Sequence, residues 1–172
     1  MKKLNTYTNK KLTIVHNRCV PETKEELKEI IKERLEKDPD ADLNDIDVSN
    51  ITDMSDLFNC LDPHNIDISK WDVSSVKNMQ YMFCMCENFN SDLSHWDVSK
   101  VNNMQKMFFD CQNFNSDLSE WNVSNVTDMI HMFFGCTKFD SDLSNWDVSK
   151  VKYMVYVFDG CDSMKELPKW FH

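Results

Sequence analysis

Glycine is nearly absent from this chain of 172 residues, which contains only Gly135 and Gly160. Loops that cradle phosphate groups need glycine where the backbone approaches the ligand closely. No nucleotide-binding fingerprint is therefore present, and the sequence predicts no cofactor.

Long apolar runs are also missing. No stretch approaches the roughly 18 or more apolar residues that a membrane-spanning helix requires, so no contact with a membrane is predicted. The first residues are basic, but no apolar run of about 7–15 residues follows them, as it would in a secretion signal. We expect the protein to lie in the cytoplasm of the producing or infected cell, with its cysteines reduced. The alternative is the cell surface, if a signal segment has been removed.

Basic residues are scarce outside the N-terminus. The formal net charge is −10, and residues 41–172 carry 21 acidic residues against nine basic ones, a net of −12. An acidic body repels phosphate backbones, so direct nucleic-acid binding by this region is disfavoured and a protein partner with a basic surface is favoured. Residues 1–20 carry five basic residues and no acidic one, which would support only weak, salt-sensitive contact with nucleic acid.

A repeat of 25 residues dominates what the sequence does contain. Several apolar residue types recur at this step and form columns that stay in phase. The columns are Trp71, Trp96, Trp121 and Trp146; Val48, Val73, Val98, Val123 and Val148; Met54, Met79, Met104, Met129 and Met154; Phe58, Phe83, Phe108, Phe133 and Phe158; Cys86, Cys111, Cys136 and Cys161; and Phe89, Phe114 and Phe139. We predict that these columns form the core.

One unit, residues 92–116, divides into two halves. The alternation within Leu93 to Val98 is typical of a short strand with one buried face. The later apolar residues are spaced by three and four, as on one face of a helix or helical turn: Val101, Met104, Met107, Phe108 and Cys111. The sequence therefore predicts an α/β solenoid, a leucine-rich-repeat-like coil of strand-plus-helical-turn units with a parallel sheet.

The two ends should cap this solenoid within one folded domain. Residues 1–40 are predicted to form an N-terminal strand and helix cap. The strand is expected at 11–15, and the helix follows the capping box that begins at Thr23. Residues 41–172 are predicted to form about five repeat units, followed by a C-terminal edge strand over Leu167 to Phe171.

The repeat motif, Trp-Asp-Val-Ser-x-Val-x-x-Met-x-x-Met-Phe-x-x-Cys-x-x-Phe-Asn, resembles that of BspA-type leucine-rich-repeat proteins, in their mycoplasma-lipoprotein form. The resemblance covers roughly residues 41–166, and it implies the fold more than the function. Family members are known mainly as bacterial surface proteins that bind host or microbial macromolecules. The motif holds no catalytic residues that could be carried over to this chain.

Chemistry-bearing residues do not converge in this pattern. The five histidines stand at different phases of the repeat, whereas a hydrolytic site needs at least two groups that meet, so no catalytic residue is predicted. Copies of the Cys column could approach disulfide distance, but buried free cysteine is an ordinary core residue, and we favour that role. Cys84 and Cys86 form a lone C-x-C, which is a weak zinc signal, and no metal site is predicted.

Two columns on the expected outer face of the strands are the candidate recognition surface. One varies from copy to copy, and the other is mainly Asp. Together they comprise Lys70, Asp72, His95, Asp97, Glu120, Asn122, Asn145 and Asp147. The competing interpretation is that the Asp side chains bond local backbone at turns and the rest are merely solvated.

These observations favour a non-enzymatic protein-protein interaction module. It would be an acidic inhibitor or adaptor of bacterial or phage origin, for example an antagonist of a host defence complex. The alternative is a surface adhesin-type repeat protein that binds host macromolecules.

Overall fold

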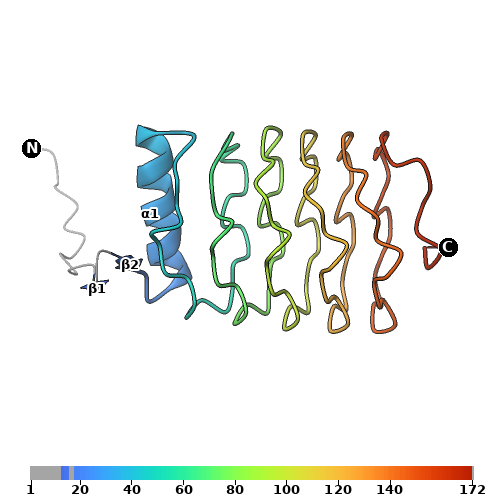
Figure 1. Ribbon diagram of the computed structural model, residues 1–172, viewed down its shortest axis with the longest axis horizontal. Helices are drawn as coiled ribbons and strands as arrows, with labels where there is room; N and C mark the ends of the chain where they lie inside the picture. The colour runs from blue at the N-terminus through green and yellow to red at the C-terminus, as the bar shows by residue number, and fades with distance from the viewer. Residues whose placement is uncertain (1–12, 16–17, 172) are drawn as a thin grey trace, which may run out of the picture.

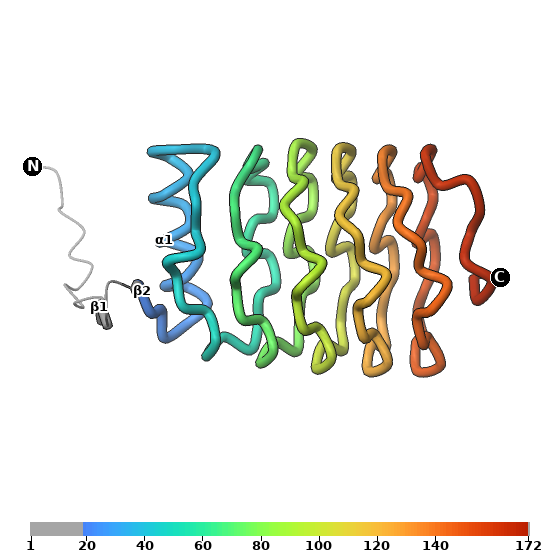
Figure 2. Tube along the Cα trace, viewed as in Figure 1, coloured from blue at the N-terminus to red at the C-terminus, as the bar shows by residue number. Residues whose placement is uncertain are grey.

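Successive coils of the chain stack side by side along one axis. The computed structural model describes residues 13–15 and 18–171. Figures 1 and 2 show the coils lying in chain order between a helix near the N-terminus and a short segment at the C-terminus. The sequence repeat is thus a repeat in space, because each coil lies against the preceding coil and the next.

A small hairpin leads into the stack. Strand β1 (Thr13–Val15) pairs antiparallel with β2 (Arg18–Val20). Cys19 in β2 then forms a parallel bridge with Ile46 in the first coil. The strand predicted over 11–15 is found at Thr13–Val15, and residues 11 and 12 lie outside the described residues.

Helix α1 (Lys24–Lys37) covers the first coil, as the sequence predicts. Its N-cap is Thr23, whose hydroxyl oxygen accepts a hydrogen bond from the Glu26 amide at 3.2 Å. Leu27 and Ile31 are fully buried and form its inner face. The predicted helical cap is therefore confirmed.

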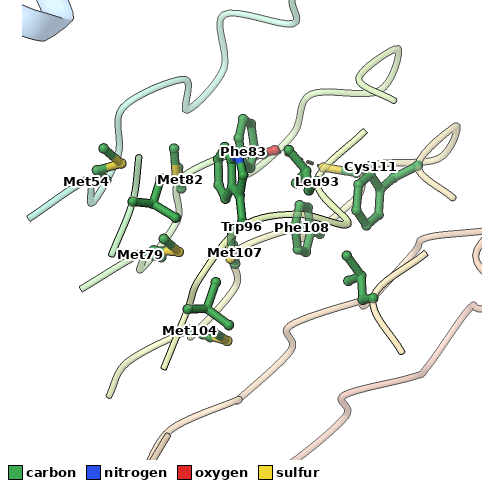
Figure 3. Close-up of a cluster of buried hydrophobic side chains, with 14 of the residues drawn as sticks. Met54, Met79, Met82, Phe83, Leu93, Trp96, Met104, Met107, Phe108 and Cys111 are labelled. Carbon is green, nitrogen blue, oxygen red and sulfur yellow. Dashed lines mark hydrogen bonds between the residues drawn. The ribbon is translucent and has the colours of Figure 1, made fainter. Parts of the chain in front are cut away.

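The apolar columns form the core, as predicted. Trp96, Val98, Met104 and Phe108 of the third coil are each at most 3% exposed. Figure 3 shows such residues from neighbouring coils packed together. Equivalent phenylalanine rings stack almost in parallel, with 5.6 Å between the centroids of Phe83 and Phe108. Burial of these apolar side chains stabilises the stack, and the stacked aromatic rings are among the largest of them.

Polar atoms inside this core are satisfied by the previous coil. The indole Nε1 of Trp96 donates to the Ile68 carbonyl at 3.2 Å, and the other core tryptophans make the equivalent bond. The Cys111 thiol donates to the Phe83 carbonyl at 2.9 Å. Burial raises the pKa of this thiol well above its usual range, so it stays a neutral donor. The core role favoured for the Cys column is confirmed.

The predicted α/β solenoid with a parallel sheet is wrong. Among the described residues, the coils of the stack contain no helix and only isolated parallel bridges, such as Asn78 to Asn103. The spacing explains the missing helices. A helix with its side chains is about 10–12 Å across, whereas neighbouring coils place equivalent rings 5.6 Å apart. Residues 101–111 therefore fold into successive tight turns.

The predicted strand over Leu93 to Val98 is also replaced by turns. The Trp96 amide donates to the Leu93 carbonyl, and the Val101 amide donates to the Val98 carbonyl. Each turn is reinforced by an aspartate carboxylate that accepts from the amide two residues later. Such local bonds compete with a strand ladder. The alternation of buried and exposed residues survives because the segment remains extended between its two turns.

The C-terminal segment is not the predicted edge strand. Residues 167–171 make a turn in which the Phe171 amide donates to the Pro168 carbonyl at 2.9 Å. Trp170 instead completes the tryptophan column. Its ring stacks on Trp146 at 6.3 Å between centroids, and its Nε1 donates to the Leu143 carbonyl. The last aromatic ring thus covers one half of the open end.

Candidate protein-binding surface

The eight residues predicted to form a recognition surface are all exposed. They lie beside the buried Trp column, one pair in each of four successive coils. In the third coil, His95 stands in the first turn and Asp97 just before the second. The structure thus brings the two columns to the outside of the stack, although on turns and not on a sheet.

The side chains of the Asp column make the hydrogen bonds to nearby backbone that the competing, structural interpretation predicts. The Asp97 carboxylate accepts from the Ser99 amide at 3.0 Å, and Asn122 accepts from the Ser124 amide in the same way. Hydrogen bonds from the Ser99 hydroxyl and amide lower the pKa of Asp97. These bonds hold the turns, and the side chains of both residues remain exposed, so recognition stays a prediction.

A second surface was not predicted. It consists of aromatic and basic side chains on the turns of the Met-Phe half of each coil, and we call it the aromatic wall. Its members are Tyr81, Lys106, Phe109, His131, Phe134 and Tyr156. Five are half-buried and Tyr156 is 55% exposed, so the rings are held in place but remain accessible.

The side chains of the aromatic wall contact one another across coils. Phe109 stacks on Phe134 with 5.0 Å between centroids, and His131 stacks on Tyr156 at 5.4 Å. The Lys106 ammonium lies 5.5 Å from the centre of the Tyr81 ring and 5.0 Å from that of Phe109. A cation held over two rings is attracted to both faces, which fixes the position of this long side chain.

Left-handed backbone positions create this wall. Lys106 has φ 52° and stands third in the turn closed by the Met107 amide and the Met104 carbonyl. Tyr81, His131 and Tyr156 occupy the same position with φ between 54° and 57°. A positive φ in the third position of a turn directs these side chains outward. The sequence analysis did not find these outward side chains because it assigned the apolar spacing to a helix.

One signal in the sequence could have found the wall. Tyr, Lys, His and Tyr occupy this column in successive copies, whereas the core columns keep one residue type. Variation between copies was the criterion that selected Lys70, His95, Glu120 and Asn145. Applied to every column, it would have selected the aromatic wall as well.

A shallow groove on another side of the stack is lined by amides. It has a volume of about 600 Å³ and is bordered by His64, Asn65, Asn88, Asn90, Asn113, Asn115 and Lys138. The Asn90 side-chain oxygen accepts from the Asn115 amide at 2.8 Å, and the Asn115 oxygen accepts from Asp140 at 2.9 Å. These side chains therefore link consecutive coils and serve the stack itself.

Metal ligands do not gather in the part of the chain that the structure describes, where no three His, Cys, Asp or Glu side chains are placed to hold an ion. Desolvation raises the pKa of Cys84 to about 11 and that of Cys86 to about 12, which disfavours the thiolate that would act as a ligand or nucleophile. Within the same residues, no helix has the length and apolar character needed to span a bilayer.

The repeat is shared with a known family. The family model described as "Mycoplasma protein of unknown function, DUF285" matches residues 25–119 and again residues 95–171. Comparison with curated proteins and with solved structures found no match. The two overlapping matches extend from α1 to the last aromatic residues, so they include the helical cap as well as the coils. This chain belongs to the DUF285 family of mycoplasma-type repeat proteins.

Proposed function

We propose that this protein is a non-enzymatic protein-interaction module whose partner binds the aromatic wall. The single observation that carries the proposal is the group of accessible rings fixed around Lys106 and His131. Protein interfaces are enriched in aromatic side chains, and the residues that dominate their binding energy are often rigid rings. The wall offers both properties, because its turns and stacking restrict the rings before a partner arrives.

Exposed apolar side chains support the same surface. Tyr153 and Val155 are each more than half exposed, and they lie in the last coil close in sequence to Tyr156, the equally exposed member of the wall. An apolar patch left open on a folded chain commonly marks an interaction site. The acidic columns beside the Trp core would favour a partner that is basic around its contact with the rings. We also propose, from the shared motif, that this protein is related to BspA-type proteins.

A pair of matched variants tests which surface binds. Full-length tagged protein is used to capture partners from nuclease-treated lysate, with bound proteins identified by mass spectrometry. The wall variant carries Lys106→Ser and Tyr156→Ser, and the column variant carries Asp97→Lys and Glu120→Lys. We expect a stoichiometric partner that the wild-type and the column variant retain and the wall variant loses by at least about tenfold, equivalent to 1.4 kcal/mol.

The control is an unchanged circular dichroism spectrum for both variants. Loss of the partner in the column variant alone would transfer the proposal to the columns of Lys70 and Asp72. Retention by both variants would overturn the assignment to either surface.

A further inference from the structure

Between residues 104 and 110, and at the equivalent positions of the other coils, the hydrogen bonds between coils all run in one direction. The amides that flank these turns, those of Asn102 and Asn113, donate the opposite way, to the carbonyls of Lys77 and Glu87. In the third coil, the amides of Met104, Lys106 and Phe108 donate to carbonyls of the fourth coil, each at 2.9 Å. The amides of Asp110 and of the equivalent residues in other coils do the same. Along these turns, each coil therefore presents carbonyl oxygens to the coil before it and N–H groups to the coil after it.

Helix α1 closes the carbonyl end of this ladder. The Lys24 ammonium lies 3.0 Å from the Asp53 carboxylate and 2.9 Å from the Ser55 hydroxyl. The Lys28 ammonium donates to the Asp56 main-chain carbonyl at 2.8 Å. The oxygen atoms that these two lysines contact are two side-chain oxygens and a turn carbonyl, and none is a main-chain carbonyl of the ladder row. Helix α1 covers this end through its buried inner face, which packs on the apolar core.

The opposite end is left with donors. The amides of Met154, Tyr156, Phe158 and Gly160 correspond to the donors of earlier coils, and none bonds to another described residue. The carbonyls of the same coil are already occupied, since those of residues 153, 155, 157 and 159 accept from the fourth coil. Trp170 and Phe171 cover only the Trp-Phe side of this end.

The side chains at this edge are more exposed than their equivalents one coil earlier. Val155 is 54% exposed, whereas Ile130, one coil earlier in the same column, is half-buried. Tyr156 is 55% exposed, whereas His131, on which its ring stacks, is half-buried. The edge thus combines an unpaired row of N–H donors with the apolar surface that one more coil would bury.

We propose that this end docks a coil of the same repeat from another protein chain, one whose carbonyl row is uncovered. An ordinary β-strand presents both N–H and C=O groups along one edge, so it would place donors opposite donors. Along its Met-Phe turns, a coil of this repeat presents four carbonyls and no amide on its leading edge. It would also continue the columns of Val155 and Tyr156. The polarity of the ladder thus selects a head-to-tail arrangement.

A second copy in its capped form does not meet this requirement. Its carbonyl end is covered by α1, and contact between two C-terminal ends would bring two rows of donors together. We therefore expect the wild-type protein to be monomeric by itself. Displacing α1 should convert it into a chain that has both complementary ends.

The test is the oligomeric state of full-length variants by analytical ultracentrifugation. Lys28→Glu with Ile31→Glu puts charge into the buried contact of α1 and should detach the helix. We expect this variant to associate with itself and with the wild-type protein as concentration rises. Adding Val155→Lys and Tyr156→Lys should remove self-association, whereas Asp72→Lys with Glu120→Lys, the same number of added lysines away from the ends, should not.

Circular dichroism establishes that the helix is detached and the stack still folded. If the first variant unfolds, Lys24→Glu with Lys28→Glu is a milder change that removes only the cations of the cap. A folded, uncapped variant that stays monomeric would overturn the proposal. A wild-type dimer that Val155→Lys and Tyr156→Lys abolish would also overturn the proposal, because that dimer would show that two donor edges pair.

Discussion

The two ends of the stack are completed in different ways. At the N-terminal end, α1 buries Leu27 and Ile31 completely and places two lysines against oxygen atoms of the first coil. At the C-terminal end, Trp170 and Phe171 cover the aromatic half of the last coil and leave the turn half open. The N-terminal end is covered by a helix outside the repeat, and the C-terminal end is partly covered by a shortened repeat.

This difference shows what a coil contributes and what it needs. A middle coil has both faces covered by copies of itself, so its apolar side chains and its directed hydrogen bonds are satisfied without any special residue. A terminal coil lacks one neighbour, and the polarity of the ladder decides which chemistry can replace it. Hydrogen-bond donors suit the carbonyl end, and acceptors suit the N–H end.

The largest effect should come from removing an aromatic ring in the middle of the stack. Phe108 is fully buried between Phe83 and Phe133, so Phe108→Ala should lower the free energy of unfolding by about 3–5 kcal/mol. Phe158 stacks on Phe133 on one side and meets Phe171 on the other, and it is 6% exposed. Phe158→Ala should therefore cost less, about 2–3 kcal/mol. Urea denaturation measures both values, and equal losses would mean that the C-terminal segment packs as well as a coil does.

The next comparison sets the two caps against each other. Leu27→Ala removes a fully buried side chain from α1 and should cost about 2–4 kcal/mol. Leu167, in the C-terminal segment, is 52% exposed, and Leu167→Ala should change stability by less than about 0.5 kcal/mol. Thermal unfolding of the two variants at matched concentration provides the measurement. A large loss at Leu167 would contradict the view that this end is only half covered.

The core and the helical cap could be predicted from the sequence because their signals depend on burial alone. A column such as Trp71 to Trp146 must face inward whatever the backbone does, since a repeated large apolar side chain has no other place. The capping box at Thr23 likewise depends on a bond between residues three apart. Neither inference required the path of the chain between coils.

The path itself was mispredicted because spacings of three and four do not identify a helix uniquely. Successive turns closed by bonds to the third residue give the same periodicity, as the amides of Met107 and Cys111 show. The choice between the two depends on the distance between coils, which is a tertiary property. The aromatic wall was missed for the same reason, because Lys106 and Phe109 are turned outward only by the left-handed residues of these turns.

Those left-handed residues differ along the stack. Met85 and Asp110 have φ 60° and 57° at the position that Gly135 and Gly160 occupy in the later coils, with φ 75° and 79°. Met85→Gly should relieve backbone strain and stabilise the protein by up to about 1 kcal/mol, because glycine adopts positive φ without a steric penalty.

The reverse substitution should have the opposite sign. Gly135→Ala would place a Cβ atom 2.9 Å from the Asp110 carboxylate oxygen, so we expect a loss of about 1–2 kcal/mol. Chemical denaturation of the two variants is the measurement. A Met85→Gly variant less stable than the wild type would show that the half-exposed Met85 side chain contributes more by packing than it costs in strain.

The smallest effect should come from the Asp column and should depend on pH. Seven carboxyl groups have a lowered pKa, and two of them, Asp97 and Asp147, belong to the Asp column. The cause is hydrogen bonds, first from Asn44 for Asp67 and from nearby serines for the others: Asp53, Asp67, Asp92, Asp97, Asp117, Asp142 and Asp147. For Asp53 burial works against the charge, but bonds from Ser55 and Lys24 outweigh it. A carboxyl whose pKa is lower in the folded state contributes stability above its unfolded pKa of about 3.9. That contribution is lost as the pH falls through the folded-state pKa.

Asp97→Asn and Asn122→Asp form a matched pair that isolates this contribution within one column. Asn can still accept from the serine amide, as Asn122 does from Ser124 at 3.2 Å, but it does not titrate. Asp97→Asn should therefore lower stability at about pH 7 by less than about 0.5 kcal/mol, and the difference from the wild type should vanish as the pH falls through the lowered pKa of Asp97. Asn122→Asp should raise stability at neutral pH and lose that gain over the same range. Urea unfolding at several pH values measures both. A difference that persists in acid would mean that geometry, and not charge, distinguishes the two residues. If Asp and Asn instead gave equal stability at every pH, they would be interchangeable as turn formers in this column, and the charge of Asp would be free to serve a partner.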